Sequence, residues 1–248
     1  MTEKYILEGL IAALAGFFGA VAGGGGLITL PFIMLLGEPA LTSIGTNKML
    51  ACLTTTSSAA VFAKKRFFEI SKWKYCLLFT IFGSIAGVFF IRKIPSEILE
   101  MYLPYIIISV CLYAVFKKNN KNFNTNINGD SHKMSTSILG FILGFYGGCI
   151  GAGLGMFWTS LMMAKYKINI VHATAISRVM CFISNTTAFA LFAIFGHVNY
   201  KIGLVMGLAM SVGSFFGAQM VIKFGQKFIK IILCVVCILM CTQLVLAR

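Results

Sequence analysis

Acidic residues are scarce in this chain: only seven of its 248 residues are Asp or Glu, against 21 Lys and Arg. Charged residues of both signs make up 11% of the sequence, whereas a soluble domain carries about 25% to cover its surface. Hydrophobic residues instead make up 58%, and several apolar runs reach the roughly 20 residues that a membrane-spanning helix requires. The composition therefore excludes an ordinary soluble domain and predicts an all-α, polytopic membrane protein.

The few carboxylates also lie away from the middle of the apolar runs. They fall at predicted helix ends or in connections: Glu3, Glu8, Glu38, Glu69, Glu97, Glu100 and Asp130. A carboxylate proton relay or a carboxylate cage for Na⁺ within the membrane is therefore not expected. The sequence also lacks a Ser/His pair or a metal-ligating cluster at a useful spacing. We therefore predict that the chain is not an enzyme and that it binds no metal or cofactor.

Positive charge is abundant, with a formal net charge of +14. In a soluble protein this excess would favour nucleic acid as a partner, but here the Lys and Arg residues lie mostly in short connections. Such residues accumulate on the cytoplasmic side of a membrane protein. If each broken segment described below is a hairpin, thirteen of them fall on one side and five on the other. This asymmetry predicts a multi-pass protein of the plasma membrane with both termini outside the cytoplasm and no nucleic-acid partner.

The eight cysteines all fall in apolar runs. Cys234 and Cys237 have the C-x-x-C spacing of a redox site, but the βαβ context of a thioredoxin-like protein is absent from the sequence. Packing as small apolar residues is therefore the favoured interpretation. An intramembrane thiol redox enzyme is one alternative function. A membrane sensor or scaffold without transport, which would need a partner domain or an interaction tail, is another.

Two glycine-rich stretches interrupt the apolar pattern. The first is Gly23–Gly26, and the second runs from Gly147 to Gly155. Each glycine costs a helix interior about 1 kcal/mol relative to alanine, so neither stretch is expected to stay helical. In hydrocarbon the released backbone groups are tolerated only where they are buried in protein or line a polar cavity. We therefore predict that each break turns the chain back as a hairpin and that the two breaks mark a transport site.

The two breaks belong to an internal duplication. The stretch Lys48–Thr56 aligns with Arg178–Thr186 at an offset of 130 residues, and Gly83-Ser84-x-x-Gly87 aligns with Gly213-Ser214-x-x-Gly217 at the same offset. We predict one integral membrane domain with three parts, namely a first membrane repeat over 1–116, a polar cytoplasmic linker over 117–133 and a second membrane repeat over 134–248.

Each repeat is expected to contain one broken hairpin followed by three transmembrane helices, which gives about eight membrane segments. The predicted ranges are 5–37, 42–63, 73–91 and 98–116 in the first repeat and 136–164, 171–195, 202–222 and 228–246 in the second. Because each half then crosses the membrane an odd net number of times, the two repeats are predicted to be inverted. Inverted repeats are a common plan among transporters.

The second helix of each repeat brings polar side chains into the membrane. Asn47 and Thr54 are spaced to share one face of the first of these helices, and Ser177 and Asn185 lie in the corresponding helix of the second repeat. Small and hydroxylated residues can simply pack helices together. Beside two helix breaks, however, we expect them to bind substrate.

Lys48 and Arg178 occupy matching positions in these two helices, with no acidic residue nearby in the sequence. A charge at the centre of a membrane helix costs about 2.5–3.5 kcal/mol, so both residues either anchor at lipid headgroups or attract an anion from opposite sides of a path. Backbone N–H groups at the breaks would complete an anion site. The expected glycine cradle comprises Gly23, Gly24, Gly25, Gly26, Gly151, Gly153 and Gly155.

The break followed by Leu27–Pro31 and Gly45–Lys48 resembles the TauE/SafE (TSUP) family of sulfite and organosulfonate exporters. The second half is similar to it as well, through Gly144–Gly148, Gly151–Gly155 and Ala173–Arg178. The resemblance covers essentially the whole chain and implies a multi-pass plasma-membrane transporter of small anions. At Gly148-Cys149 many members of the family carry an acidic residue, which this chain lacks.

We therefore interpret the chain as a secondary transporter that moves a sulfur oxyanion or an organosulfonate by alternating access of its two repeats. Its expected partners are the small anionic substrate and the lipid bilayer. The sequence leaves open whether the protein forms a homo-oligomer.

Overall fold

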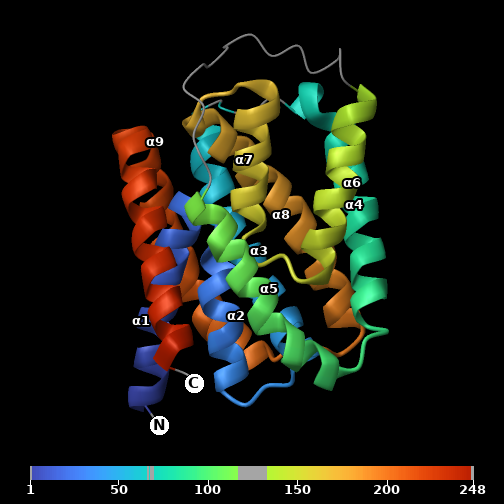
Figure 1. The fold of residues 1–248 in the computed structure, drawn as a ribbon, viewed down its shortest axis with the longest axis vertical. Helices are drawn as coiled ribbons and strands as arrows, with labels where there is room; N and C mark the ends of the chain where they lie inside the picture. Colours follow the sequence, from blue (N-terminus) through green and yellow to red (C-terminus); the bar gives the residue numbers. More distant parts are fainter. Residues whose placement is uncertain (1, 66, 68–69, 117–132, 247–248) are drawn as a thin grey trace.

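The computed structural model describes residues 2–65, 67, 70–116 and 133–246 of the chain (Figure 1). The regular structure within these ranges is helical throughout, which confirms the all-α prediction. The helices are α1 (Thr2–Ala22), α2 (Gly25–Leu35), α3 (Ala40–Lys64), α4 (Ile70–Ile91), α5 (Ser96–Phe116), α6 (Lys133–Cys149), α7 (Leu154–Tyr166), α8 (Ile170–Ile194) and α9 (Tyr200–Leu246). Apart from Lys133, which begins α6, the predicted linker lies outside the described residues.

The first glycine stretch breaks the helix where the sequence predicts. α1 ends at Ala22 and α2 begins at Gly25, and the turn between them gives Gly23 a φ of 90°, a conformation that favours glycine. α2 then runs back beside α1. The two helices are in close contact where α2 begins: a Cβ on Gly25 would lie 2.9 Å from the Ala15 carbonyl oxygen and 3.1 Å from the Gly19 Cα. The two helices thus form a hairpin.

The second glycine stretch forms a similar turn. α6 ends at Cys149 and α7 begins at Leu154, and the Tyr146 hydroxyl donates a hydrogen bond of 2.6 Å to the Ala152 carbonyl between them. In Figure 1 α6 and α7 reach the upper end of the molecule, whereas α1 and α2 reach the lower end. The turns of both hairpins therefore lie toward the middle of the molecule.

Each hairpin packs against a helix from the other half of the chain. α1 lies against α9, and α6 lies against α4. A Cβ on Gly213 of α9 would lie 1.9 Å from the Ala13 carbonyl oxygen, and one on Gly148 of α6 would lie 2.1 Å from the Ser84 carbonyl oxygen. Close backbone contacts at small residues are typical of helix packing in membranes. The two halves are therefore interlocked.

The outward surface is apolar over several helices, with Leu78 and Phe82 of α4, Tyr105 of α5 and Phe216 of α9 all exposed. Within the described residues, three helices are long and apolar enough to cross a membrane: Ser71–Ile91, Ile170–Ile194 and Tyr200–Phe224. Three of the hairpin helices are shorter, because the glycine breaks interrupt them: α2 has 11 residues, α6 has 17 and α7 has 13. The structure therefore supports a helical membrane protein.

The C-terminal region differs from the prediction of two helices at 202–222 and 228–246. Residues Tyr200–Leu246 form one helical element of 47 residues. The element does not run straight: residues 213–217 follow α1 in the direction of its chain, whereas the red C-terminal part of α9 returns to the lower end of the molecule, near the start of α1 (Figure 1). The sequence signal for a boundary is the polarity of 223–227, but Lys and Gln are good helix formers. Polarity at this point therefore does not interrupt the helical backbone.

Candidate functional site

The two glycine breaks meet each other inside the molecule. A Cβ on Gly23 would lie 2.5 Å from both the Gly155 carbonyl carbon and the Met156 backbone nitrogen. The turn of the α1–α2 hairpin and the start of α7 therefore touch backbone to backbone, which only glycine permits at this position. Segments about 130 residues apart in the chain are brought together at this contact.

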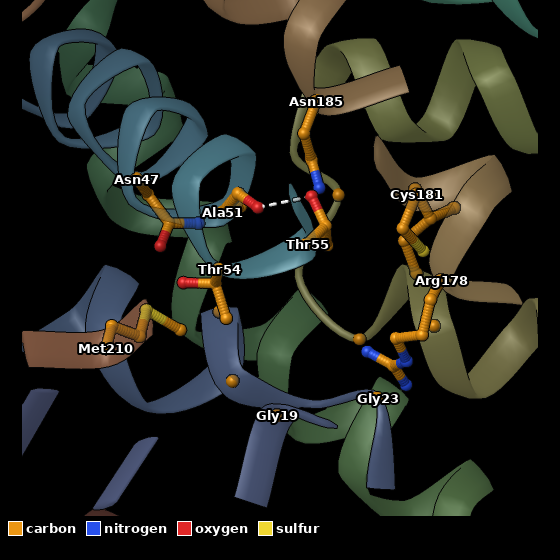
Figure 2. A pocket seen from close by; sticks show the side chains of 16 residues that line it. Gly19, Gly23, Asn47, Ala51, Thr54, Thr55, Arg178, Cys181, Asn185 and Met210 are labelled. Carbon is orange, nitrogen blue, oxygen red and sulfur yellow. Dashed lines mark hydrogen bonds between the residues drawn. The ribbon is translucent and has the colours of Figure 1, made fainter. Parts of the chain in front are cut away.

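A small cavity of about 40 Å³ lies beside the contact, between α3 and α8 (Figure 2). Its lining comes from both breaks, from the two polar helices and from α9. The lining residues are Gly19, Gly23, Gly25, Gly26, Asn47, Ala51, Thr54, Thr55, Gly151, Gly153, Leu154, Gly155, Arg178, Cys181, Asn185 and Met210. Most of the residues predicted to bind substrate are thus brought to one place.

Figure 2 shows how α3 and α8 face each other across this cavity. Asn47 and Thr54 approach from α3, whereas Arg178 and Asn185 approach from α8. The Thr55 hydroxyl donates a hydrogen bond of 2.6 Å to the Ala51 carbonyl within its own helix. The two polar faces predicted from the sequence therefore form opposite walls of one site.

Arg178 supplies the positive charge of the site. The residue is only 4% exposed, and its Nε and Nη2 atoms are buried without a hydrogen-bond partner among the residues that the structure describes. The guanidinium points toward Gly23 in Figure 2, and Nη2 would lie 3.0 Å from a Cβ on Gly155. A buried cation is costly unless it is paired and hydrogen-bonded. Among the described residues, Nε and Nη2 therefore remain unused hydrogen-bond donors at the cavity.

Lys48 has a different role from its counterpart Arg178. Its side chain is 1% exposed, and its ammonium donates hydrogen bonds to the carbonyl oxygens of Gly147 and, at 2.7 Å, Ile150. These carbonyls belong to the last turn of α6 and the break beyond it, where backbone acceptors lack intrahelical donors and a cation is favourable. Lys48 therefore caps the end of α6 and does not line the cavity. Its burial, like that of Arg178, argues against anchoring at lipid headgroups.

We expect Lys48→Met to lower the stability of the protein. The substitution leaves two buried carbonyl groups without the ammonium donor, and an unsatisfied buried acceptor costs about 1–3 kcal/mol. The midpoint of thermal unfolding in detergent should fall clearly below that of the wild type. Lys93→Met, at an exposed lysine, is the control and should leave the midpoint unchanged. An unchanged midpoint in Lys48→Met would contradict the capping role.

Two other predicted residues hold the walls of the site together. Asn47 accepts a hydrogen bond of 2.6 Å from the Thr29 hydroxyl of α2, and Ser177 donates one of 2.9 Å to the Gly155 carbonyl. Ser177 and Gly24 do not line the cavity; a Cβ on Gly24 would lie 2.2 Å from the Met156 side chain.

Sequence reasoning does not assign several cavity residues to the site. Ala51, Thr55 and Cys181 lie on or beside the polar faces, so the helical spacing could have included them. Met210 comes from α9, and no pattern in the sequence around it indicates that it lines the cavity. Cys234 and Cys237, whose spacing leaves a thiol redox enzyme as an alternative although packing is favoured, lie beyond the part of α9 whose side chains the structure describes.

One carboxylate also differs from its predicted setting. Glu8 is expected at a helix end, but α1 begins at Thr2, so Glu8 lies in the second turn of that helix and is 3% exposed. It is not among the residues that line the cavity.

Apolar helices interrupted by two breaks that meet inside the molecule are typical of membrane transporters. The family model described as Sulfite exporter TauE/SafE matches residues 9–244 of the chain. The chain therefore belongs to the TauE/SafE family, which confirms the resemblance seen in the sequence, and it is a membrane transporter.

Similar proteins carry the same general description. The chain is 31% identical over 241 residues to a probable membrane transporter protein of Haemophilus influenzae, covering 95% of this chain and 92% of the relative. It is 30% identical over 233 residues to the probable membrane transporter protein ORF9 of a Sinorhizobium species, covering 94% and 89%. It is 29% identical over 236 residues to the probable membrane transporter protein YfcA of Escherichia coli K12, covering 94% and 87%. No solved structure gives a significant match.

Proposed function

We propose that this protein carries a small anion across the plasma membrane and that Arg178 is the side chain that binds it. The observation that carries the proposal is the buried guanidinium, whose Nε and Nη2 have no partner among the described residues. The described residues that line the cavity include no carboxylate that could neutralise it. A bound anion would supply the missing charge and accept both hydrogen bonds.

The backbone at the two breaks favours the same sign of charge. α2 begins at Gly25 and α7 begins at Leu154, so both helices start at the cavity. The first N–H groups of a helix have no intrahelical acceptor and carry a partial positive charge. Gly26 and Gly155, which line the cavity, leave room for a ligand to approach that backbone. The amide of Asn185 would add a neutral hydrogen-bond donor, whereas the Thr54 hydroxyl donates to the Leu50 carbonyl at 2.6 Å and would have to turn to reach a ligand.

The cavity has a volume of about 40 Å³, enough for only a few atoms. This size favours a compact sulfur oxyanion over a longer organosulfonate as the substrate, in keeping with the description of the family as sulfite exporters. Lys48 does not contribute charge to the cavity in this proposal but positions the second break.

We infer that transport occurs by alternating access between two inverted repeats. The supporting features are the hairpins that enter from opposite ends of the molecule and the matched pairs α1–α9 and α4–α6. Rocking of one half against the other would open the contact between the glycine breaks first toward one side and then toward the other. The asymmetry of Lys and Arg along the sequence places both termini outside the cytoplasm in this scheme.

A ligand screen by thermal unfolding tests the proposal. Purified protein would be heated with sulfite, thiosulfate, sulfate, taurine or sulfoacetate, with the counter-ion and ionic strength held constant. We expect at least one compact oxyanion to raise the unfolding midpoint, because a ligand at 100 times its dissociation constant stabilises the native state by about 2.7 kcal/mol. The shift should disappear in Arg178→Met. A shift that persists in this variant would refute binding by Arg178.

A further inference from the structure

A second site lies at the surface, away from the glycine breaks. A groove of about 510 Å³ runs between the end of α3 and the middle of α9. Its lining residues are Val61, Lys64, Lys65, Phe215, Phe216, Gln219, Met220, Ile222 and Lys223. The groove shares no residue with the cavity at the breaks, so an inference from it is independent of the proposed function.

The groove combines two kinds of surface. Phe215, Phe216 and Met220 are 44%, 55% and 38% exposed, and they form an apolar wall along α9. Lys64 ends α3 and Lys65 follows it, so these two lysines mark one end of the groove. An apolar wall that leads to positive charge is complementary to a molecule with acyl chains and an anionic head.

The charge of the groove is of one sign. Three of the described lining residues are lysines and none is acidic, which gives a formal charge of +3. A lysine at the C-terminal end of a helix interacts favourably with the helix dipole, and this interaction alone explains Lys64 and Lys65. It does not extend to Lys223, which lies within α9 and far from either end of that helix. The positive-inside rule accounts for the side of the membrane on which these lysines lie, but not for their gathering around one apolar groove.

We propose that the groove binds one anionic phospholipid, with the phosphate between Lys64, Lys65 and Lys223 and the acyl chains along Phe215 and Phe216. Basic pockets between membrane helices on the cytoplasmic side bind anionic headgroups. The positive-inside pattern assigns these three lysines to the cytoplasmic side. The Gln219 side chain lies beside them as a hydrogen-bond donor.

Native mass spectrometry of delipidated protein in detergent tests this site. The protein would be titrated with phosphatidylglycerol, with phosphatidylcholine of the same acyl chains, and with soluble glycerol phosphate. We expect one phosphatidylglycerol to bind at least tenfold more tightly than phosphatidylcholine. The variant Lys64→Gln/Lys65→Gln/Lys223→Gln should lose this preference. The matched control Lys74→Gln/Lys93→Gln/Lys201→Gln, which removes the same charge elsewhere, should keep it.

A fluorescence measurement keeps the test valid if the triple variant folds poorly. The chain has two tryptophans, Trp73 and Trp158, and both are buried. In Phe216→Trp a new tryptophan would stand in the groove, and brominated phosphatidylglycerol should quench it at mole fractions where brominated phosphatidylcholine does not.

Several results would overturn the proposal. These are equal binding of phosphatidylglycerol by the wild type and the groove variant, equal quenching by the two brominated lipids, and full competition by glycerol phosphate alone. Concentration-dependent dimerisation that protects Phe216→Trp from both lipids would show instead that a second copy of the chain covers the groove.

Discussion

Replacing Arg178 by methionine should reduce the saturable flux of the anion in proteoliposomes by at least about 100-fold. The variant loses two hydrogen bonds from a charged donor, each worth about 1.5–3 kcal/mol, and 1.4 kcal/mol corresponds to a factor of ten in affinity. Arg178→Lys should retain part of the flux, because an ammonium preserves the charge but not the planar fork of donors. Flux would be measured with the oxyanion that the thermal screen identifies.

The same variant should not lose stability in the absence of substrate. Methionine replaces a buried charge that has no described partner, and exchanges of this kind are often neutral or stabilising. Arg178→Met is thus expected to behave oppositely to Lys48→Met, although the two residues occupy matching positions. Lys201→Met, at an exposed lysine, serves as the flux control. Normal flux in Arg178→Met, or a loss of stability equal to that of Lys48→Met, would contradict the proposal that Arg178 binds the anion.

The second large effect is expected at the contact between the two breaks. Gly23→Ala introduces a Cβ at a φ of 90° and 2.5 Å from backbone atoms of Gly155 and Met156. Backbone strain of about 1–3 kcal/mol and overpacking of about 1–3 kcal/mol should add, so the free energy of unfolding should fall by roughly 2–6 kcal/mol. The measurement is the midpoint of thermal unfolding in detergent, together with anion flux.

Gly37→Ala separates the two causes. Gly37 has a φ of 92°, but a Cβ there would meet no atom within 4 Å, so this substitution introduces the strain without the overlap. Its midpoint should lie between those of the wild type and Gly23→Ala, and its flux should be normal. If both variants lose the same stability and both transport normally, then the contact between the breaks is dispensable.

Much of the helical pattern could be predicted because it depends on local chemistry. Runs of glycine break a membrane helix wherever they occur, so the break after Ala22 and the break after Cys149 follow from the sequence. Helical spacing likewise places Asn47 and Thr54 together on one face of α3. The TauE/SafE resemblance is confirmed by the family model, which matches residues 9–244.

The remaining features depend on partners that lie far away in the chain. Lys48 and Arg178 look equivalent in the sequence, and only the fold shows that one faces the carbonyls of α6 while the other faces the cavity. Met210 reaches the site because α9 packs against α1, a contact that no local pattern encodes. The polarity of 223–227 predicts the end of a helix, but α9 forms one helical element through these residues, because polar residues can also continue a helix.

α1 packs against α9 and α6 packs against α4, so each hairpin depends on a helix from the other half of the chain. This dependence affects the order in which the protein can fold during its synthesis. During synthesis α4 is complete long before α6 emerges, so the backbone surface that Gly148 of α6 will cover stays in contact with lipid until then. The contact surface of α1 stays uncovered for longer still, because its partner α9 follows all the other described helices. The small-residue surfaces of α1 and α6 are therefore buried only when their partners from the other half are also in the membrane. Two separately expressed halves would therefore be expected to need each other in the same membrane to become stable.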